Sequence, residues 1–176
     1  EWWDLSLVDP DNRRPVDFPA RSRALQEIVD RSTSDPMAVA QELLRSPQDG
    51  RIKMLLIMRA LHARALHCDL FENGDYAPVE ITGRLARHVF AFTRNAADRC
   101  ALIVVPRLLH GIVHPGQMPL GADVWGDTSC ALPHPPSTAW HNAVTGQTLE
   151  PSETLPLGTV FKDLPVALLI SSEVTQ

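Results

Sequence analysis

The chain has 176 residues, of which 44% are hydrophobic and 21% charged, a composition typical of a globular protein that buries a core of its own. Its formal net charge of −5 disfavours a nucleic-acid partner, because binding to phosphate backbones needs clustered lysine and arginine. No stretch approaches the roughly 20 apolar residues that span a bilayer, so we expect no membrane partner either.

The segment DPDNRRP, which begins at Asp9, places two carboxylates and two guanidinium groups between stiff prolines. Asp9 and Asp11 accept hydrogen bonds and Arg13 donates them, a combination that suits a ligand rich in hydroxyl groups. Trp2 and Trp3 offer apolar faces on which a sugar ring can stack. The alternative is a surface loop held by exposed Asp–Arg pairs, each worth only about 0–1 kcal/mol, and composition alone favours that alternative.

Residues 19 to 70 show helical patterns. Asp35 followed by Pro36 predicts an N-cap with proline at the first helical position, and Ser46 followed by Pro47 repeats that start signal. The helix predicted after Pro47 has apolar residues around much of its circumference. We therefore expect it to be mostly buried through Ile52, Met54, Leu55, Leu56, Ile57, Met58, Leu61 and Ala65.

Beyond residue 72 the pattern changes to the alternation of half-buried strands. Strands are expected at residues 77–82, 88–93, 100–105, 124–132, 138–144, 159–162 and 166–171, with a loop at 110–122. Short strands with irregular connections and no intervening helices predict an antiparallel β-sandwich. The predicted fold class is therefore α+β.

No motif indicates a catalytic centre or a bound cofactor. Neither a serine-nucleophile elbow nor a phosphate-binding glycine loop occurs. Cys68, Cys100 and Cys130 are an odd and widely spaced set, which favours reduced thiols in a cytoplasmic protein over a disulfide framework. We expect no cofactor.

Histidine and tryptophan residues allow two further hypotheses. His110 and His114 are four residues apart, but they lie on no predicted helix that would bring them to one ion, so we expect no metal site. Trp125 and Trp140 could be the sugar platforms of a carbohydrate-binding module. Large aromatic residues of this kind are more often part of a core, and we favour that interpretation.

The opening residues also carry a resemblance to a known family. The segment EWWDLSLVDPDNRRP, residues 1–15, resembles the stretch after the eighth barrel strand in the maltooligosyltrehalose synthase family, a branch of the α-amylase family of (β/α)8 barrels. In many relatives a comparable Asp-Pro-x-x-Arg stretch binds sugar on the non-reducing side of the cleaved bond, which implies that role for Asp9 and Arg13. Similarity extends over nearly the whole chain, through GRIK at 50–53, GDY at 74–76, HVFAF at 88–92, WGDT at 125–128, WHNAVTG at 140–146 and LPVALL at 164–169.

The resemblance implies an isomerase of trehalose biosynthesis. Such an enzyme converts the reducing-end α-1,4 bond of a maltooligosaccharide into an α,α-1,1 bond by intramolecular transglycosylation. The resemblance places the opening segment at the C-terminal end of a barrel strand, where barrel enzymes build their sites. It therefore favours sugar binding by Asp9, Arg13, Asp11, Trp2 and Trp3. The family's three catalytic carboxylates precede the eighth strand, so we expect none of them in this chain.

The resemblance also implies a division at residue 72. Residues 1–72 are expected to end the catalytic barrel, and residues 73–176 to form a C-terminal β-sandwich domain. Because the first residue is not methionine, we interpret the chain as part of a longer enzyme, inactive alone, whose partners are a maltooligosaccharide and the missing barrel portion. Two alternatives stay open: a noncatalytic carbohydrate-binding or structural module, and part of another glycoside hydrolase of the α-amylase family.

Overall fold

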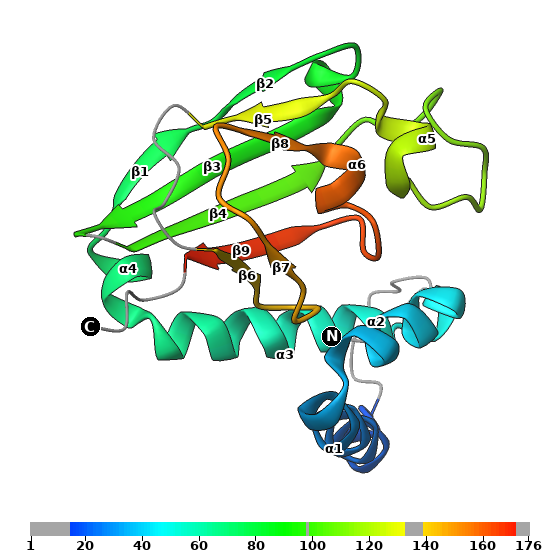
Figure 1. Ribbon diagram of the computed structural model, residues 1–176. Helices are drawn as coiled ribbons and strands as arrows, with labels where there is room; N and C mark the ends of the chain where they lie inside the picture. The colour runs from blue at the N-terminus through cyan, green and yellow to red at the C-terminus, as the bar shows by residue number, and fades with distance from the viewer. Residues whose placement is uncertain (1–14, 98, 133–138, 172–176) are drawn as a thin grey trace.

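The computed structural model describes residues 15–97, 99–132 and 139–171, and it joins N-terminal helices to antiparallel sheets (Figure 1). This arrangement confirms the predicted α+β class. The helical part comprises α1 (Phe18–Ser34), α2 (Pro36–Arg45), the 3-10 helix η1 (Pro47–Asp49), α3 (Arg51–Leu66) and α4 (Cys68–Glu72). Every helix among these described residues is too short or too polar to cross a membrane.

Two antiparallel sheets follow the helices. The larger has six strands in the order β1-β3-β4-β9-β6-β7, and the smaller has three in the order β2-β5-β8. The elements are β1 (Asp75–Pro78), β2 (Glu80–Thr82), η2 (Ala86–His88), β3 (Val89–Ala96), β4 (Arg99–Pro106), α5 (Gly121–Trp125), β5 (Ser129–Ala131), β6 (Trp140–Asn142), β7 (Thr148–Leu149), β8 (Thr154–Pro156), α6 (Leu157–Val160) and β9 (Ala167–Ser171).

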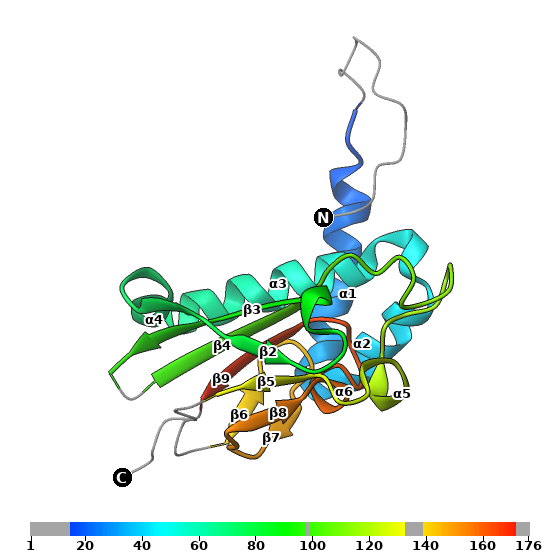
Figure 2. The same cartoon turned by 90° about the horizontal axis from the view of Figure 1, so that it is seen from above.

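The six-stranded sheet has buried residues on both of its faces. Leu102 and Leu169 lie in a core shared with the three-stranded sheet, α5 and α6. Ala101 and Ile170 point the other way and pack against α3 and α4, as expected because successive strand residues alternate between faces. Figures 1 and 2 show α3 running along one face of the large sheet. The two sheets therefore share a core, as in a sandwich, but helices cover part of the remaining face of the larger one.

The start signal of α2 is confirmed and that of α3 is wrong. The Asp35 carboxylate accepts a hydrogen bond from the backbone N–H of Ala38 at 2.9 Å. Ser46, by contrast, makes no side-chain cap bond, and the residues after it form only η1. Gly50 has φ +77°, in the left-handed region that ends a helical run, and α3 therefore begins at Arg51.

One predicted strand is replaced by a helical turn, and the strand expected at 124–132 begins in a helix and becomes extended only at β5. Residues 159–162 were expected to be extended, but Leu157, Val160 and Phe161 are all buried, and their spacing of three and four residues suits one face of a helical turn. Likewise, Trp125 ends α5, and its ring lies 5.1 Å from that of Phe161. The assumption of a β-rich region without intervening helices is therefore wrong.

Smaller differences concern the strands themselves. The predicted strand at 77–82 is divided at Val79 into β1 and β2, which belong to different sheets. Strands β7 and β8 were not predicted. The strands expected at 88–93, 100–105 and 166–171 are confirmed as β3, β4 and β9.

The division at residue 72 stays a prediction. One apolar core includes Ala63 and Leu70 from the helices together with Ala101 and Ile170 from the sheet. This core therefore crosses the predicted boundary, so α3 and α4 are packed on the sheet rather than separated from it.

Candidate functional site

All of the predicted sugar-binding residues lie outside the described part of the chain. Asp9, Arg13, Asp11, Trp2 and Trp3 belong to residues 1–14, so their role stays a prediction. The structure begins directly after them, at the residues that lead into α1. The functional surface that can be described is therefore the one formed by α1, α2 and α3.

Local signals in the sequence start α1 immediately after the predicted sugar-binding segment. The Asp17 carboxylate accepts a hydrogen bond from the backbone N–H of Ala20 at 2.9 Å, and Pro19 occupies the first turn, where its missing N–H costs no hydrogen bond. Further along α1, Ile28 is buried with Val39 and Leu55 from the two helices that follow. Capping and this small core thus fix the start of α1 and hold the helix against the two that follow.

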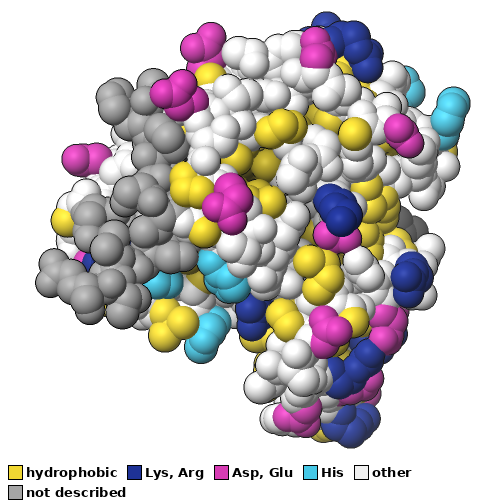
Figure 3. Space-filling model, in the orientation of Figure 1, with side chains coloured by type: hydrophobic (Ala, Val, Ile, Leu, Met, Phe, Trp, Pro, Cys, Tyr) yellow, Lys and Arg dark blue, Asp and Glu magenta, His cyan; other side chains and the backbone are white. Residues whose placement is uncertain are grey.

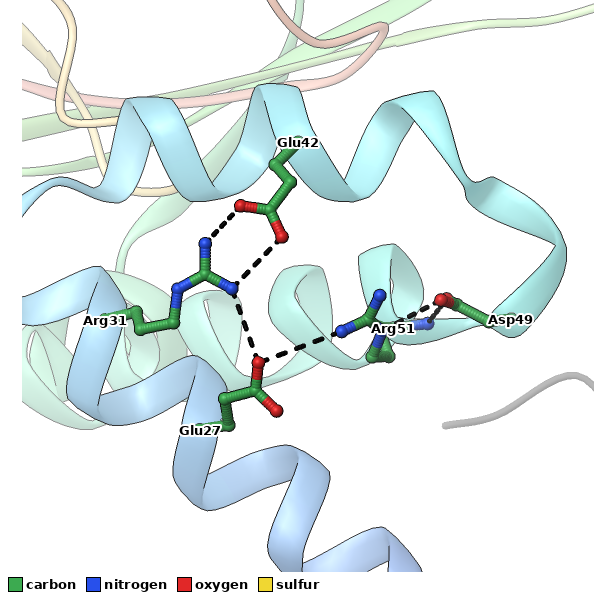
Figure 4. A network of polar contacts seen from close by, with 5 residues as sticks. All are labelled: Glu27, Arg31, Glu42, Asp49 and Arg51. Atoms are coloured by element: carbon green, nitrogen blue, oxygen red, sulfur yellow. Dashed lines mark hydrogen bonds and ion pairs between the residues drawn. The ribbon is translucent and has the colours of Figure 1, made fainter.

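A chain of ion pairs joins the three helices on their outer side (Figure 4). Arg31 of α1 forms a bidentate pair with Glu42 of α2, and it also contacts Glu27 at 3.4 Å. Arg51 at the start of α3 lies 3.9 Å from Glu27 and donates to Asp49 at 2.8 Å. The hydrogen bond from Arg31 lowers the pKa of Glu42 and, reciprocally, raises that of Arg31. The network thus links α1 to α2 and α3 at the surface of the small core that they share.

An apolar groove of about 750 Å³ lies between α1 and α3. Phe18, Leu25 and Val29 contribute from α1, and Ile57 and Leu61 from α3; all five side chains are exposed. Leu61 is 59% exposed, so the expectation that the third helix is mostly buried is wrong. The helix has apolar residues on two sides, and within the described chain only one of them meets the sheet.

A smaller pocket of about 310 Å³ with basic side chains in its walls adjoins the groove, since Arg59 and His62 line both. Half-buried Arg59 donates from Nε to the carbonyl oxygen of Ala143 at 2.8 Å. His141 lies in the same pocket, and its pKa is lowered by desolvation and then by the positive charge of Arg59. Figure 3 shows histidine side chains gathered beside a basic side chain over α3.

Trp125 and Trp140 do not form sugar platforms. Both side chains are 0% exposed and belong to the core between the sheets. The indole N–H of Trp125 donates to the carbonyl oxygen of Pro119 at 2.8 Å. The preferred interpretation of these residues as core aromatics is confirmed. The hypothesis of a carbohydrate-binding module rested on these two side chains being exposed, and they are not.

Cysteine and histidine residues form no chemical centre in the part of the chain that the structure describes. Cys68, Cys100 and Cys130 are free thiols, and burial raises the pKa of Cys100 to about 11 and that of Cys130 to about 12, which makes both poor nucleophiles. Across residues 15–97, 99–132 and 139–171, no group of three His, Cys, Asp or Glu side chains could hold a metal ion.

Sequence reasoning missed both the groove and the pocket. The apolar residues of α3 were recognised, but the side left uncovered depends on where the sheet packs. Arg59 and Ala143 are 84 residues apart, so no local pattern links them. An arginine within an apolar helical stretch was the one available signal.

The chain is similar to known proteins in sequence and in fold. No protein-family model matches it. Over 170 residues, or 97% of the chain, it is 35% identical to proteins from two strains of Mycobacterium tuberculosis, each described as a maltooligosyl trehalose synthase. A solved structure of a mutant maltooligosyltrehalose synthase from Arthrobacter ramosus matches with a TM-score of 0.66 and 33% identity over 97% of the chain.

These matches extend from the first helices to the last strand, but they cover a small part of each relative. The chain spans 17% of the length of the curated relatives and 19% of the solved chain. The identity and the similarity of fold agree with the resemblance found in the opening residues, which is thereby confirmed. The chain is homologous to a portion of about 170 residues of maltooligosyltrehalose synthase.

Proposed function

We propose that this chain is the C-terminal portion of a maltooligosyltrehalose synthase. The whole enzyme converts the reducing-end α-1,4-glucosidic bond of a maltooligosaccharide into an α,α-1,1 bond by intramolecular transglycosylation, in the cytoplasm. One observation carries the proposal: 33–35% identity to such synthases over 97% of the chain, with a TM-score of 0.66. Residues 1–72 end the (β/α)8 barrel, and residues 73–176 form its C-terminal β-rich domain.

In this proposal the chain contributes substrate contacts and no reacting group. Asp9 and Asp11 accept hydrogen bonds from glucose hydroxyls, Arg13 donates to a hydroxyl or braces Asp9, and Trp2 or Trp3 stacks on a pyranose ring. The similarity to the synthases over 97% of the chain supports this role. The catalytic carboxylates belong to the remaining portion of the synthase.

Substrate turnover tests the proposal. The chain is co-expressed with the remaining portion of the synthase, and formation of maltooligosyltrehalose from maltopentaose is measured. Asp9→Ala and Arg13→Ala should each lower kcat/KM about ten- to hundredfold, the loss expected for a hydrogen bond to a charged group worth about 1.5–3 kcal/mol. Asp30→Ala, at an exposed position of α1, is the matched control and should leave kcat/KM unchanged.

Two results would contradict the proposal. The first is turnover of maltopentaose by the 176-residue chain alone. The second is full activity of the assembled enzyme with both substitutions present. Release of glucose or maltose in place of a non-reducing product would instead indicate a hydrolase of the α-amylase family.

A further inference from the structure

The outer faces of α1 and α3 form one continuous surface that the described chain leaves uncovered. Phe18 is 67% and Leu61 59% exposed, and both line the groove between the two helices. Leu66, which is 65% exposed, continues the apolar surface into the adjoining pocket. Adjacent large side chains exposed in this way are typical of a protein interface.

The charge of this surface is one-sided. None of the described residues that line the groove or the pocket is acidic, whereas Arg21, Arg59 and several histidines contribute to the walls. Within residues 15–97, 99–132 and 139–171, Arg59 bonds only to a carbonyl oxygen and meets no carboxylate. Partial burial of this guanidinium group lowers its pKa, and a carboxylate beside it would stabilise the charged form more strongly than the carbonyl oxygen does.

Resting on the proposed function, we propose that this surface docks the remaining portion of the synthase, which fills the groove with an apolar segment and places a carboxylate beside Arg59. The described relatives contain more than four times the length matched here, since the chain covers 17–19% of them. That remainder supplies ample surface for one partner. The carboxylate also lies within reach of His141, which shares the pocket with Arg59.

A second copy of the chain fits this surface less well. A two-fold symmetric contact brings the same patch of each copy together. Two grooves lined by arginine and histidine would then face each other without any acid from either lining, and like charges in contact oppose association. Charge complementarity therefore favours a partner that carries an acidic group.

The test uses the chain co-expressed and co-purified with the remaining portion of the synthase. Dissociation of the complex is followed by sedimentation over a dilution series at about 50 mM and about 500 mM salt, which changes the screening of charges. Leu61→Asp should weaken the complex at least about tenfold, and Arg59→Gln about tenfold with a smaller salt dependence. Thermal unfolding of each chain alone reports whether Arg59→Gln, which also loses the bond to Ala143, still folds.

Each variant has a matched control. Leu108→Asp introduces the same charge at a leucine that is 63% exposed and lies outside the groove. Arg64→Gln removes an exposed arginine of α3 that lines neither cavity. Both controls should change the dissociation constant less than about twofold, as is usual for positions outside an interface.

The outcomes separate the inference from the proposed function. If the unmodified complex forms maltooligosyltrehalose but Leu61→Asp and Arg59→Gln dissociate as it does, the docking surface is wrong and the proposed function stands. If the variants dissociate as predicted but the complex has no such activity, the docking surface stands and the proposed function is wrong. Dimers of the chain alone that Leu61→Asp disrupts would overturn the inference in favour of a second copy.

Discussion

Replacement of Trp125 probes the core between the two sheets. The side chain is fully buried, its ring contacts Phe161 at 5.1 Å, and its indole N–H bonds to Pro119. Truncation of a buried tryptophan to alanine removes apolar contacts and leaves a cavity, so Trp125→Ala should destabilise the chain by about 3–5 kcal/mol. That loss is a large fraction of the roughly 5–15 kcal/mol that stabilises a typical domain.

A second substitution isolates the polar contribution. Trp125→Phe keeps an aromatic ring but removes the N–H that satisfies the Pro119 carbonyl oxygen. Because an unsatisfied buried acceptor costs about 1–3 kcal/mol, we expect a loss of about 1–2 kcal/mol. Leu108→Ala, at a side chain that is 63% exposed, is the control and should change stability by less than about 0.5 kcal/mol.

Urea unfolding followed by far-ultraviolet circular dichroism measures these differences in the free energy of unfolding. They are calculated from the shift in the midpoint urea concentration, with the dependence of the free energy on urea held at the same slope for all variants. The core assignment predicts the order Trp125→Ala, then Trp125→Phe, then the control. A tryptophan that served as an exposed sugar platform would give a different pattern: unchanged stability for both variants, with weaker binding to glucan. Losses below about 1 kcal/mol for Trp125→Ala, well under the range for buried aromatics, would refute the packing argument.

Three further predictions concern single contacts. Gly83→Ala should destabilise the chain by about 1–3 kcal/mol more than Gly116→Ala in thermal unfolding. Both glycines have positive φ, but a Cβ at Gly83 would lie 2.7 Å from the Cα of Thr128, whereas Gly116 faces open space. Because the pKa of Glu42 is lowered, its carboxylate stabilises the fold at pH values above the usual pKa of 4.5, and this contribution is lost as pH falls through the folded pKa. Hydrogen exchange of α1 should accelerate in that pH range, and Glu42→Gln should abolish the pH dependence. His141 should titrate below 6.5 by NMR, and its contribution to stability, present above 6.5, should fade as pH falls through the lowered pKa. Arg59→Gln should raise that pKa without returning it to 6.5, because desolvation is the larger cause; an unchanged pKa would show that the charge of Arg59 is not felt.

Sequence alone determined the features that depend on neighbouring residues. Asp35 and Pro36 predict the start of α2, because the capping hydrogen bond joins groups only three residues apart. Strands β3, β4 and β9 contain short apolar runs rich in branched or aromatic residues, a pattern of buried strands that is visible without knowing their partners. The resemblance of the opening residues to the synthase family was also present in the sequence and needed no structure.

Tertiary structure decided what depends on distant residues. Residues 159–162 do not form the expected strand, because the short helical turn that begins at Leu157 is stabilised by packing of Val160 and Phe161 in the core that holds Trp125 rather than by local propensity. The exposed side of α3 and the meeting of Arg59 with Ala143 and His141 arise only when the helix lies on the sheet. Local signals act through capping and periodicity over a few residues, whereas the groove and the pocket arise from burial shared by segments far apart in the chain.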